Sequence, residues 1–147
     1  HVLCCKNEEA RETNGIAEIF LKCLYLWQKE NAFDKVCPMD EARISKKNTY
    51  IFFDADFLYM SSELFRKITL PLTKYISITS LKAGLVKDAV LLPEKSLSTF
   101  TVKMTCRNEK DEFQRIRMLR LNQEKINYDG KLTFLDLCTL EKEKKNV

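Results

Sequence analysis

Apolar side chains recur at spacings of three and four residues near the start of the chain, which predicts an amphipathic α-helix. The stripe consists of Ile16, Ile19, Phe20, Cys23, Leu24 and Trp27. Leu21, Tyr25 and Leu26 widen it beyond one face, so we expect this helix to be covered on more than one side. Its start falls either after Asn7 or at Asn14 as an N-cap, and Asn31 marks its predicted end.

The next segment alternates between polar connections and short apolar runs. Residues 32–47 are polar and contain Pro38, which favours a connector. The β-branched and aromatic run Thr49–Phe53 predicts a buried strand. A short helix should begin at Ser61, with its apolar face made by Leu64, Phe65 and Ile68, and it should end before Pro71.

Strand patterns dominate from residue 75 to residue 106. Tyr75–Thr79 and Ala89–Leu92 both predict strands. Between Ser98 and Cys106 apolar and polar residues alternate with a period of two, the clearest such pattern in the chain. That period indicates a strand with one face in the core and the other in solvent.

The C-terminal part is less regular. Phe113–Leu121 has a helix-forming composition, but its place after a strong strand and a tight polar loop favours a hairpin strand. Asp129 and Gly130 are suited to a two-residue turn, which would pair Lys125–Tyr128 with Lys131–Leu137. Residues 139–147 predict a charged tail that forms at most a frayed helix.

These elements predict an α+β fold. We expect an N-terminal amphipathic helix and one short helix to pack on a mainly antiparallel β-sheet or open barrel. Long helices at regular intervals between strands are missing from the pattern, which argues against a doubly wound α/β fold. The 147 residues fit one domain, and the first residue, His1, suggests a domain excised from a longer protein.

Composition excludes several kinds of catalytic site. The chain has one His and three isolated Gly, so His-assisted nucleophiles and glycine-rich phosphate loops are not expected. The net charge of +4 is unevenly distributed, because residues 61–125 hold 13 Lys and Arg against 7 Asp and Glu. This surplus favours an acidic partner.

The six cysteines predict reduced thiols. Cys23, Cys106 and Cys138 occupy apolar positions of predicted elements, where a free Cys acts as a small hydrophobic residue. The spacing indicates no disulfide framework, so we expect an intracellular protein, cytoplasmic or nuclear. No Cys-x-x-Cys pair exists, so zinc is not expected; the chain predicts no cofactor and no membrane partner.

In the segment from Tyr50 to Leu58, two Asp residues follow a predicted strand. On a strand, Asp54 and Asp56 would point the same way and offer oxygen ligands to Mg²⁺ or Mn²⁺. The string resembles the strand and Asp-x-Asp element of metal-dependent glycosyltransferases and, more loosely, that of haloacid dehalogenase-type phosphatases. The resemblance covers about ten residues and implies a divalent-metal-dependent transferase. The chain departs from the phosphatase pattern at Leu58, where that pattern has Thr or Val.

A second constellation is basic. Arg115 and Arg117 would share a strand face with Phe113, and Arg120 and Lys103 lie near them in sequence. Arginines beside an aromatic ring on a sheet are typical of single-stranded nucleic-acid binding, because guanidinium groups contact phosphates while the ring stacks on a base. A strand-rich chain could carry this surface on an open barrel of the oligonucleotide-binding type.

Three hypotheses follow. The leading one is a non-catalytic interaction domain that binds a protein segment within a larger intracellular complex. It would use Leu21, Tyr25 and Trp27 on the wide helix, or a strand edge that accepts an added strand. The alternative is a single-stranded nucleic-acid-binding domain that uses the basic constellation. The second alternative is the metal-dependent transferase, and no enzymatic activity is expected under the first two.

Overall fold

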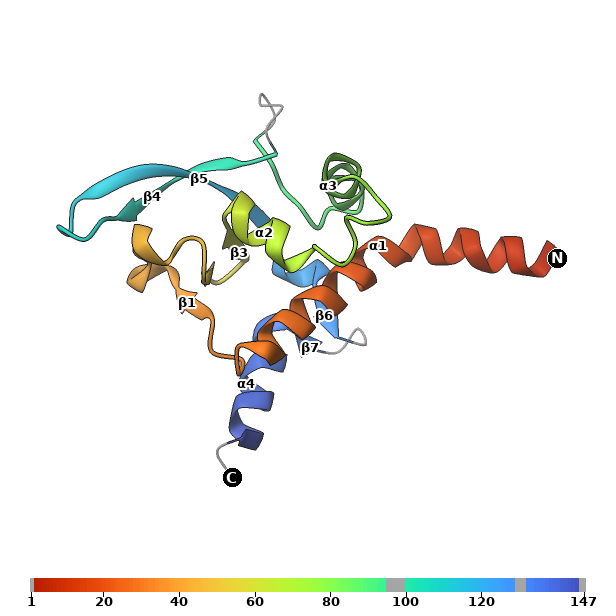
Figure 1. Ribbon diagram of the computed structural model, residues 1–147, viewed down its shortest axis with the longest axis horizontal. Coiled ribbons are helices and arrows are strands. Elements are labelled where there is room, and N and C mark those ends of the chain that lie inside the picture. Colours follow the sequence, from red (N-terminus) through yellow and green to blue (C-terminus); the bar gives the residue numbers. More distant parts are fainter. Residues whose placement is uncertain (1, 95–99, 129–131, 146–147) are drawn as a thin grey trace.

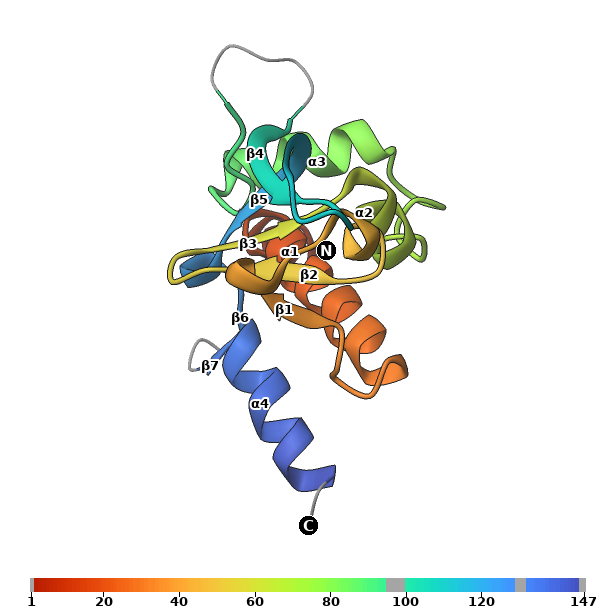
Figure 2. The same ribbon diagram turned by 90° about the vertical axis from the view of Figure 1, so that its left-hand side faces the viewer.

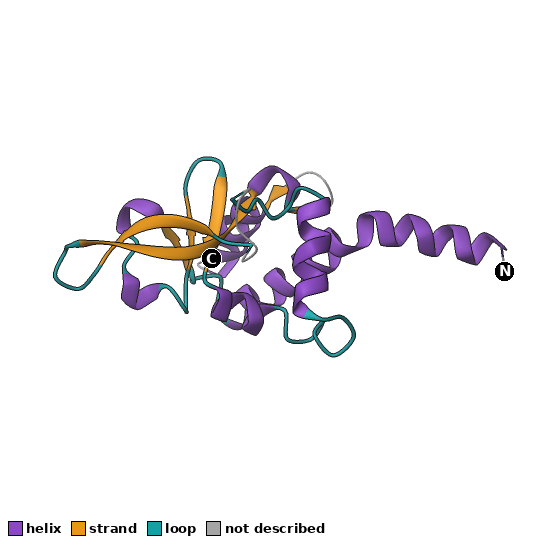
Figure 3. Cartoon of the chain, turned by 90° about the horizontal axis from the view of Figure 1, so that it is seen from above, coloured by secondary structure: helices purple, strands orange, loops and turns teal. Residues whose placement is uncertain are grey.

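The computed structural model describes residues 2–94, 100–128 and 132–145, and it leaves out the side chains of residues 2–14, 127, 128, 132 and 145. The helices of this part of the chain are α1 (Val2–Glu30), α2 (Ser62–Ile68), α3 (Ile78–Lys87) and α4 (Phe134–Lys145). The strands are β1 (Val36–Pro38), β2 (Ile51–Phe53), β3 (Phe57–Met60), β4 (Val102–Arg107), β5 (Phe113–Asn122), β6 (Asn127–Tyr128) and β7 (Leu132–Thr133). Short 3₁₀ turns are η1 (Met39–Glu41), η2 (Ile44–Lys46) and η3 (Gln123–Lys125). Figure 3 shows the strands gathered on one side and α1 projecting from the other.

The main sheet has the strand order β1-β2-β3-β5-β4. Within it β1 and β2 are parallel, and the pairs β2–β3, β3–β5 and β4–β5 are antiparallel. The sheet is open, and a separate two-stranded ladder joins β6 to β7. The predicted fold class, α+β with helices on a mainly antiparallel sheet, is therefore confirmed.

Strand β5 pairs with different strands along its length. Residues 119–122 pair with β3, whereas residues 113–118 pair with β4. The two-stranded part, made of β4 and residues 113–118, is called the arm below. Figure 1 shows it curving away from the helices, on the side of the molecule opposite the projecting end of α1.

The two faces of the sheet are buried by different parts of the chain. On one face Ile51, Leu58 and Leu119 belong to the larger core, which also contains Phe20 and Phe65 from α1 and α2. The other face carries a smaller cluster of Cys37, Ala42, Phe52, Cys106 and Met118. Alternate residues of β2 and β5 thus enter opposite clusters, as the period-two geometry of strands requires.

Helix packing follows the sequence pattern closely for α1 and α2. Helix α1 packs against α2, α3 and α4, so its wide apolar surface is covered on several sides, as predicted. Helix α2 begins at the predicted cap, where the Ser61 hydroxyl accepts a hydrogen bond from the Leu64 N–H at 3.1 Å. It ends before Pro71, and α1 ends one residue before Asn31. Figure 2 shows α4 leading away from the sheet, opposite β4.

Several predicted elements differ from the structure. Tyr75–Thr79 is no strand: it ends a turn, Ser77 caps α3, and Ile78 and Thr79 are the first residues of this helix, which was not predicted. Ala89–Leu92 is reduced to a single bridge between Leu91 and Leu121. The polar connector contains β1, and β3 follows directly after Asp56.

The ends of the chain also differ from the prediction. Helix α1 begins at Val2, earlier than either predicted start. Strands β6 and β7 pair as an antiparallel ladder, but the predicted turn at Asp129–Gly130 lies outside the described residues, as do Ser98 and Thr99 of the alternating segment. From Phe134 the chain is helical, so Cys138 lies on α4 rather than on a strand.

Among the described residues, no helix has both the length and the apolar composition that a membrane-spanning segment requires.

Candidate functional site

The arm has one buried face and one open face. Val102 and Cys106 of β4 and Met118 of β5 are buried, while Lys103, Thr105, Arg115 and Arg117 are exposed. The register places Lys103 opposite Arg117 and Thr105 opposite Arg115, so these four side chains share one face. The structure therefore places Lys103 beside Arg115 and Arg117, the two arginines that the alternation had put on one face.

The open face of the arm lies on the same side of the sheet as the face that the helices cover. Leu119 and Leu121, on the same side of β5, are fully buried in the larger core. Towards the end of the arm the same side carries Arg117, Arg115 and Phe113. The sequence of β5 thus changes from apolar to basic where the helical cover ends.

The three cations of this face, Lys103, Arg115 and Arg117, form no ion pair with a described acidic residue. The nearby carboxylate of Glu94 accepts a hydrogen bond from the Lys103 backbone N–H at 2.8 Å instead. Successive side chains on one strand face are about 6.8 Å apart, so Arg115 and Arg117 form a short, regular row of positive charge.

Arg120 lies apart from this row. It pairs with Tyr59 of β3, and its position in the alternation puts it on the opposite face. Its guanidinium lies 5.1 Å from the centre of the Phe57 ring, and its Nε donates to the Leu92 carbonyl at 3.1 Å. The basic constellation predicted from sequence is thus divided, and Arg120 has structural contacts of its own.

The tip of the arm is held by a compact hydrogen-bonded turn. The Asn108 carboxamide oxygen accepts from the backbone N–H groups of Lys110 and Glu112 at 2.9 and 3.0 Å. Asp111, with a φ of 63°, places its carboxylate 3.2 Å from the guanidinium groups of both Arg43 and Arg107. These contacts fix Arg107 relative to the rest of the tip.

Arg107 in turn covers one face of an exposed aromatic ring. Its guanidinium carbon lies 4.9 Å from the centre of the Phe113 ring, which is 66% exposed. A guanidinium above the ring leaves the second face of Phe113 open for stacking. The predicted association of Phe113 with the basic row is present, and Arg107 is a further member that was not predicted.

A pocket of about 430 Å³ lies beside the arm, where η1 approaches β4. It is lined by Met39, Asp40 and Ala42 from η1 and the residue that follows it, and by Thr105, Cys106, Arg107 and Phe113 from the arm. This is called the arm pocket below. Sequence reasoning missed it because its two sides are far apart along the chain.

The Asp-x-Asp element forms the turn between β2 and β3 rather than a strand end. One carboxylate oxygen of Asp54 accepts from the N–H groups of Asp56 and Phe57 at 2.9 and 2.8 Å. The other accepts from the Tyr59 hydroxyl at 2.9 Å. Burial and this hydrogen bond to Asp54 raise the pKa of Tyr59 to about 12. The Asp54 carboxylate thus already has three donors within its own turn, and Asp56 is exposed.

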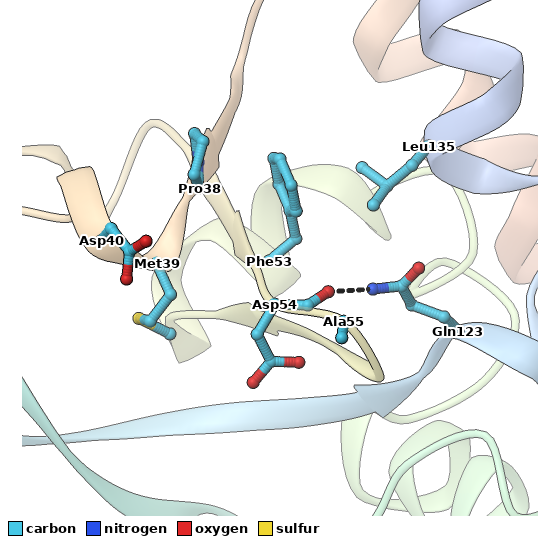
Figure 4. Close-up of a pocket in the computed structure, with 8 residues that line it drawn as sticks. All are labelled: Pro38, Met39, Asp40, Phe53, Asp54, Ala55, Gln123 and Leu135. Atoms are coloured by element: carbon cyan, nitrogen blue, oxygen red, sulfur yellow. Dashed lines mark hydrogen bonds between the residues drawn. The ribbon is translucent and has the colours of Figure 1, made fainter.

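A second pocket, of about 490 Å³, contains this turn (Figure 4). Gln123 closes one side, with its side-chain N–H group donating to the Asp54 carbonyl at 2.7 Å. Asp40 also lines the pocket, but in Figure 4 the Asp54 carboxylate points away from it. Within the described residues no three His, Cys, Asp or Glu side chains lie close enough together to hold a metal ion.

The predicted docking residues of α1 lie largely in the core. Leu21 is 7% exposed, and Tyr25 and Trp27 are half-buried against the larger core. Among the side chains of α1 that the structure describes, the large exposed apolar ones are instead Ile19, 43% exposed, and Leu26, 53% exposed. They are seven residues apart and therefore lie on one side of the helix.

The strand edges offer little room for an added strand. On the β4 edge, Glu94 binds the Lys103 N–H, and Arg43 forms a bridge with Arg107. Strand β1 has only three residues and ends at Pro38, which has no N–H. These features reduce the support for partner binding by strand addition.

The described cysteines are buried thiols. Cys23, Cys37, Cys106 and Cys138 are free, and burial raises the pKa of each, to about 12 for Cys138. A raised pKa lowers the thiolate fraction at neutral pH, so these groups are poor nucleophiles and poor metal ligands.

Comparison with known proteins adds no assignment. The chain matches no family model, no curated protein and no solved structure.

Proposed function

We propose that this chain is a non-catalytic binding domain that holds single-stranded nucleic acid along the open face of the arm. The observation that carries the proposal is the row formed by Lys103, Arg115 and Arg117, three exposed cations without an acidic partner among the described residues. A row of this kind suits a phosphate backbone, because charge-assisted hydrogen bonds from Arg and Lys to phosphate are strong and release counterions.

The aromatic ring at the end of the row supports a single strand over a duplex. Phe113 is exposed and lies at the tip of the arm, beyond Arg115. Unpaired bases stack on such rings, whereas the bases of a duplex are already stacked on each other. The phosphate contacts would hold the nucleic-acid backbone on the open face of the arm, and stacking on Phe113 would hold one base at the tip.

The test is binding of a fluorescein-labelled twelve-nucleotide uridine tract, followed by fluorescence anisotropy over a series of salt concentrations. Three phosphate contacts should give a slope of log K against log salt of about −2, because each contact on a single strand contributes about −0.7. Arg117→Glu should weaken binding about tenfold or more, since a hydrogen bond to a charged group contributes about 1.5–3 kcal/mol. The slope should become less steep by about 0.7.

Lys125→Glu is the matched control. Lys125 is exposed in η3, at the other end of β5, and its reversal changes the net charge equally. If both reversals weaken binding to the same extent, the attraction is general and the arm is not the site. If the wild-type protein does not bind the tract, the proposal is wrong.

A second candidate is the docking of a protein segment on α1, which is favoured by the exposed pair Ile19 and Leu26. Leu26→Glu should then reduce capture of a partner while nucleic-acid binding by the arm stays unchanged. Loss of capture in Arg117→Glu but not in Leu26→Glu would contradict this candidate.

A further inference from the structure

The arm pocket has features that the phosphate row does not use. Its volume of about 430 Å³ falls within the range of small-ligand sites. It shares Thr105, Arg107 and Phe113 with the arm, and Arg107 and Phe113 are the last paired residues at the tip. A strand lying along the row would therefore bring one of its nucleotides to Phe113, which lines this pocket.

The aromatic part of the pocket is held in place before any ligand binds. Asp111 contacts Arg107 through both carboxylate oxygens at 3.2 Å, and Arg107 covers one face of Phe113. The Asn108 turn fixes the position of Asp111. Because these groups need little reordering, stacking of a flat ring on the free face of Phe113 loses little entropy.

The polar part of the pocket includes the exposed carboxylate of Asp40, which also lines the pocket of the β2–β3 turn. Asp40 lies at η1 and its carboxylate is in no hydrogen bond or ion pair with another described residue. A carboxylate offers two acceptor oxygens side by side and no donor. A base that fits it should present two adjacent donors.

Among the common nucleobases, guanine has this arrangement, because its N1–H and its amino group are neighbours on the Watson–Crick edge. Cytosine, adenine and uracil each offer one donor group on that edge. Met39 and Ala42 supply apolar contacts beside the ring. We infer that the arm pocket binds a guanine base, stacked on Phe113 and hydrogen-bonded to Asp40.

This inference rests on the proposed function, so the test compares two labelled tracts: uridine only, and uridine with a single central guanine. The wild-type protein should bind the guanine-containing tract about tenfold more tightly, the discrimination expected of one good bidentate contact. Asp40→Ala should abolish this preference and leave binding to the uridine tract unchanged. Phe113→Ala should weaken binding to both tracts and also reduce the preference.

Asp56→Ala is the control, because Asp56 is an exposed carboxylate that does not line the arm pocket. It should keep the preference for guanine. If the wild-type protein binds both tracts equally, the guanine assignment is wrong while the phosphate row stands. If neither tract binds, the proposed function itself fails. A preference that persists in Asp40→Ala would place the base elsewhere.

Discussion

Lys103 on β4 lies directly opposite Arg117 on β5, and neither cation is in an ion pair with another described residue. Like charges in this position repel each other and weaken a strand pair. The repulsion between Lys103 and Arg117 lowers the stability of the fold. An anion bound between or above the two groups would relieve it.

The first prediction concerns this repulsion. Arg117→Gln should raise the free energy of unfolding by about 0.2–0.5 kcal/mol at low salt, because it removes a like-charged cross-strand neighbour. The same variant should bind the uridine tract more weakly. Urea unfolding and anisotropy on the same samples measure the two effects.

Arg115→Gln serves as the control for that experiment, because Arg115 faces the uncharged Thr105. Its binding should weaken similarly, while its stability should change less. If Arg117→Gln lowers stability instead, the guanidinium makes a stabilising contact, and repulsion does not dominate.

The second prediction concerns the turn between β2 and β3. Burial and the hydrogen bond to Asp54 raise the pKa of Tyr59 to about 12, above its ordinary value of 10.0. The folded state thus favours the protonated phenol, so this contribution to stability is complete below pH 10 and is lost as the pH rises through about 12. The stability advantage of wild type over Tyr59→Phe should therefore shrink across this window, as measured by urea unfolding at each pH.

Asp54→Asn tests the cause of that shift. Replacing the carboxylate should lower the pKa of Tyr59 towards its ordinary value, without restoring it fully because burial remains. The absorbance of the phenolate near 295 nm, taken as the difference from Tyr59→Phe, follows this titration. An unchanged pKa in Asp54→Asn would show that burial alone causes the shift.

The third prediction concerns the start of α2. Ser61→Ala should lower the free energy of unfolding by about 1 kcal/mol, because it removes the oxygen that accepts from the Leu64 N–H. Ser62→Ala should have a much smaller effect, since Ser62 is the first helical residue and does not provide the cap. Equal losses in the two variants would contradict the assignment of the cap.

Strong local signals explain which elements were predictable. The α1 stripe is recognised from its own spacing, and α2 combines a cap, an apolar face and Pro71 within eleven residues. The alternation in β5 placed Arg115 and Arg117 on one face, and the register with β4, which the sequence does not give, adds Lys103 to that face. The same alternation separates Arg120, which is an odd number of positions from Arg117 and therefore on the opposite face.

The missed elements lacked such signals or carried competing ones. Tyr75–Thr79 alternates like a strand, but Ser77 caps a helix, and Leu81 and Leu85 are buried one helical turn apart. Strands β1 and β3 are too short to show a period, and β3 is fixed by pairing with a distant part of the chain, β5. The arm pocket similarly depends on η1 meeting β4, which no local pattern predicts.

The covered edge of β4 has a consequence for how the protein behaves at high concentration. A projecting two-stranded ribbon with bare edges would be a template for further copies, and such edges start aggregation. Here the Glu94 carboxylate accepts a hydrogen bond from the Lys103 N–H, and Arg43 forms a bridge with Arg107. The positive charges of Lys103, Arg115 and Arg117 also repel those of a second copy. The arm can thus extend into solvent with its edge protected, and the charges proposed to attract a nucleic acid also oppose the pairing of one arm with the arm of a second copy.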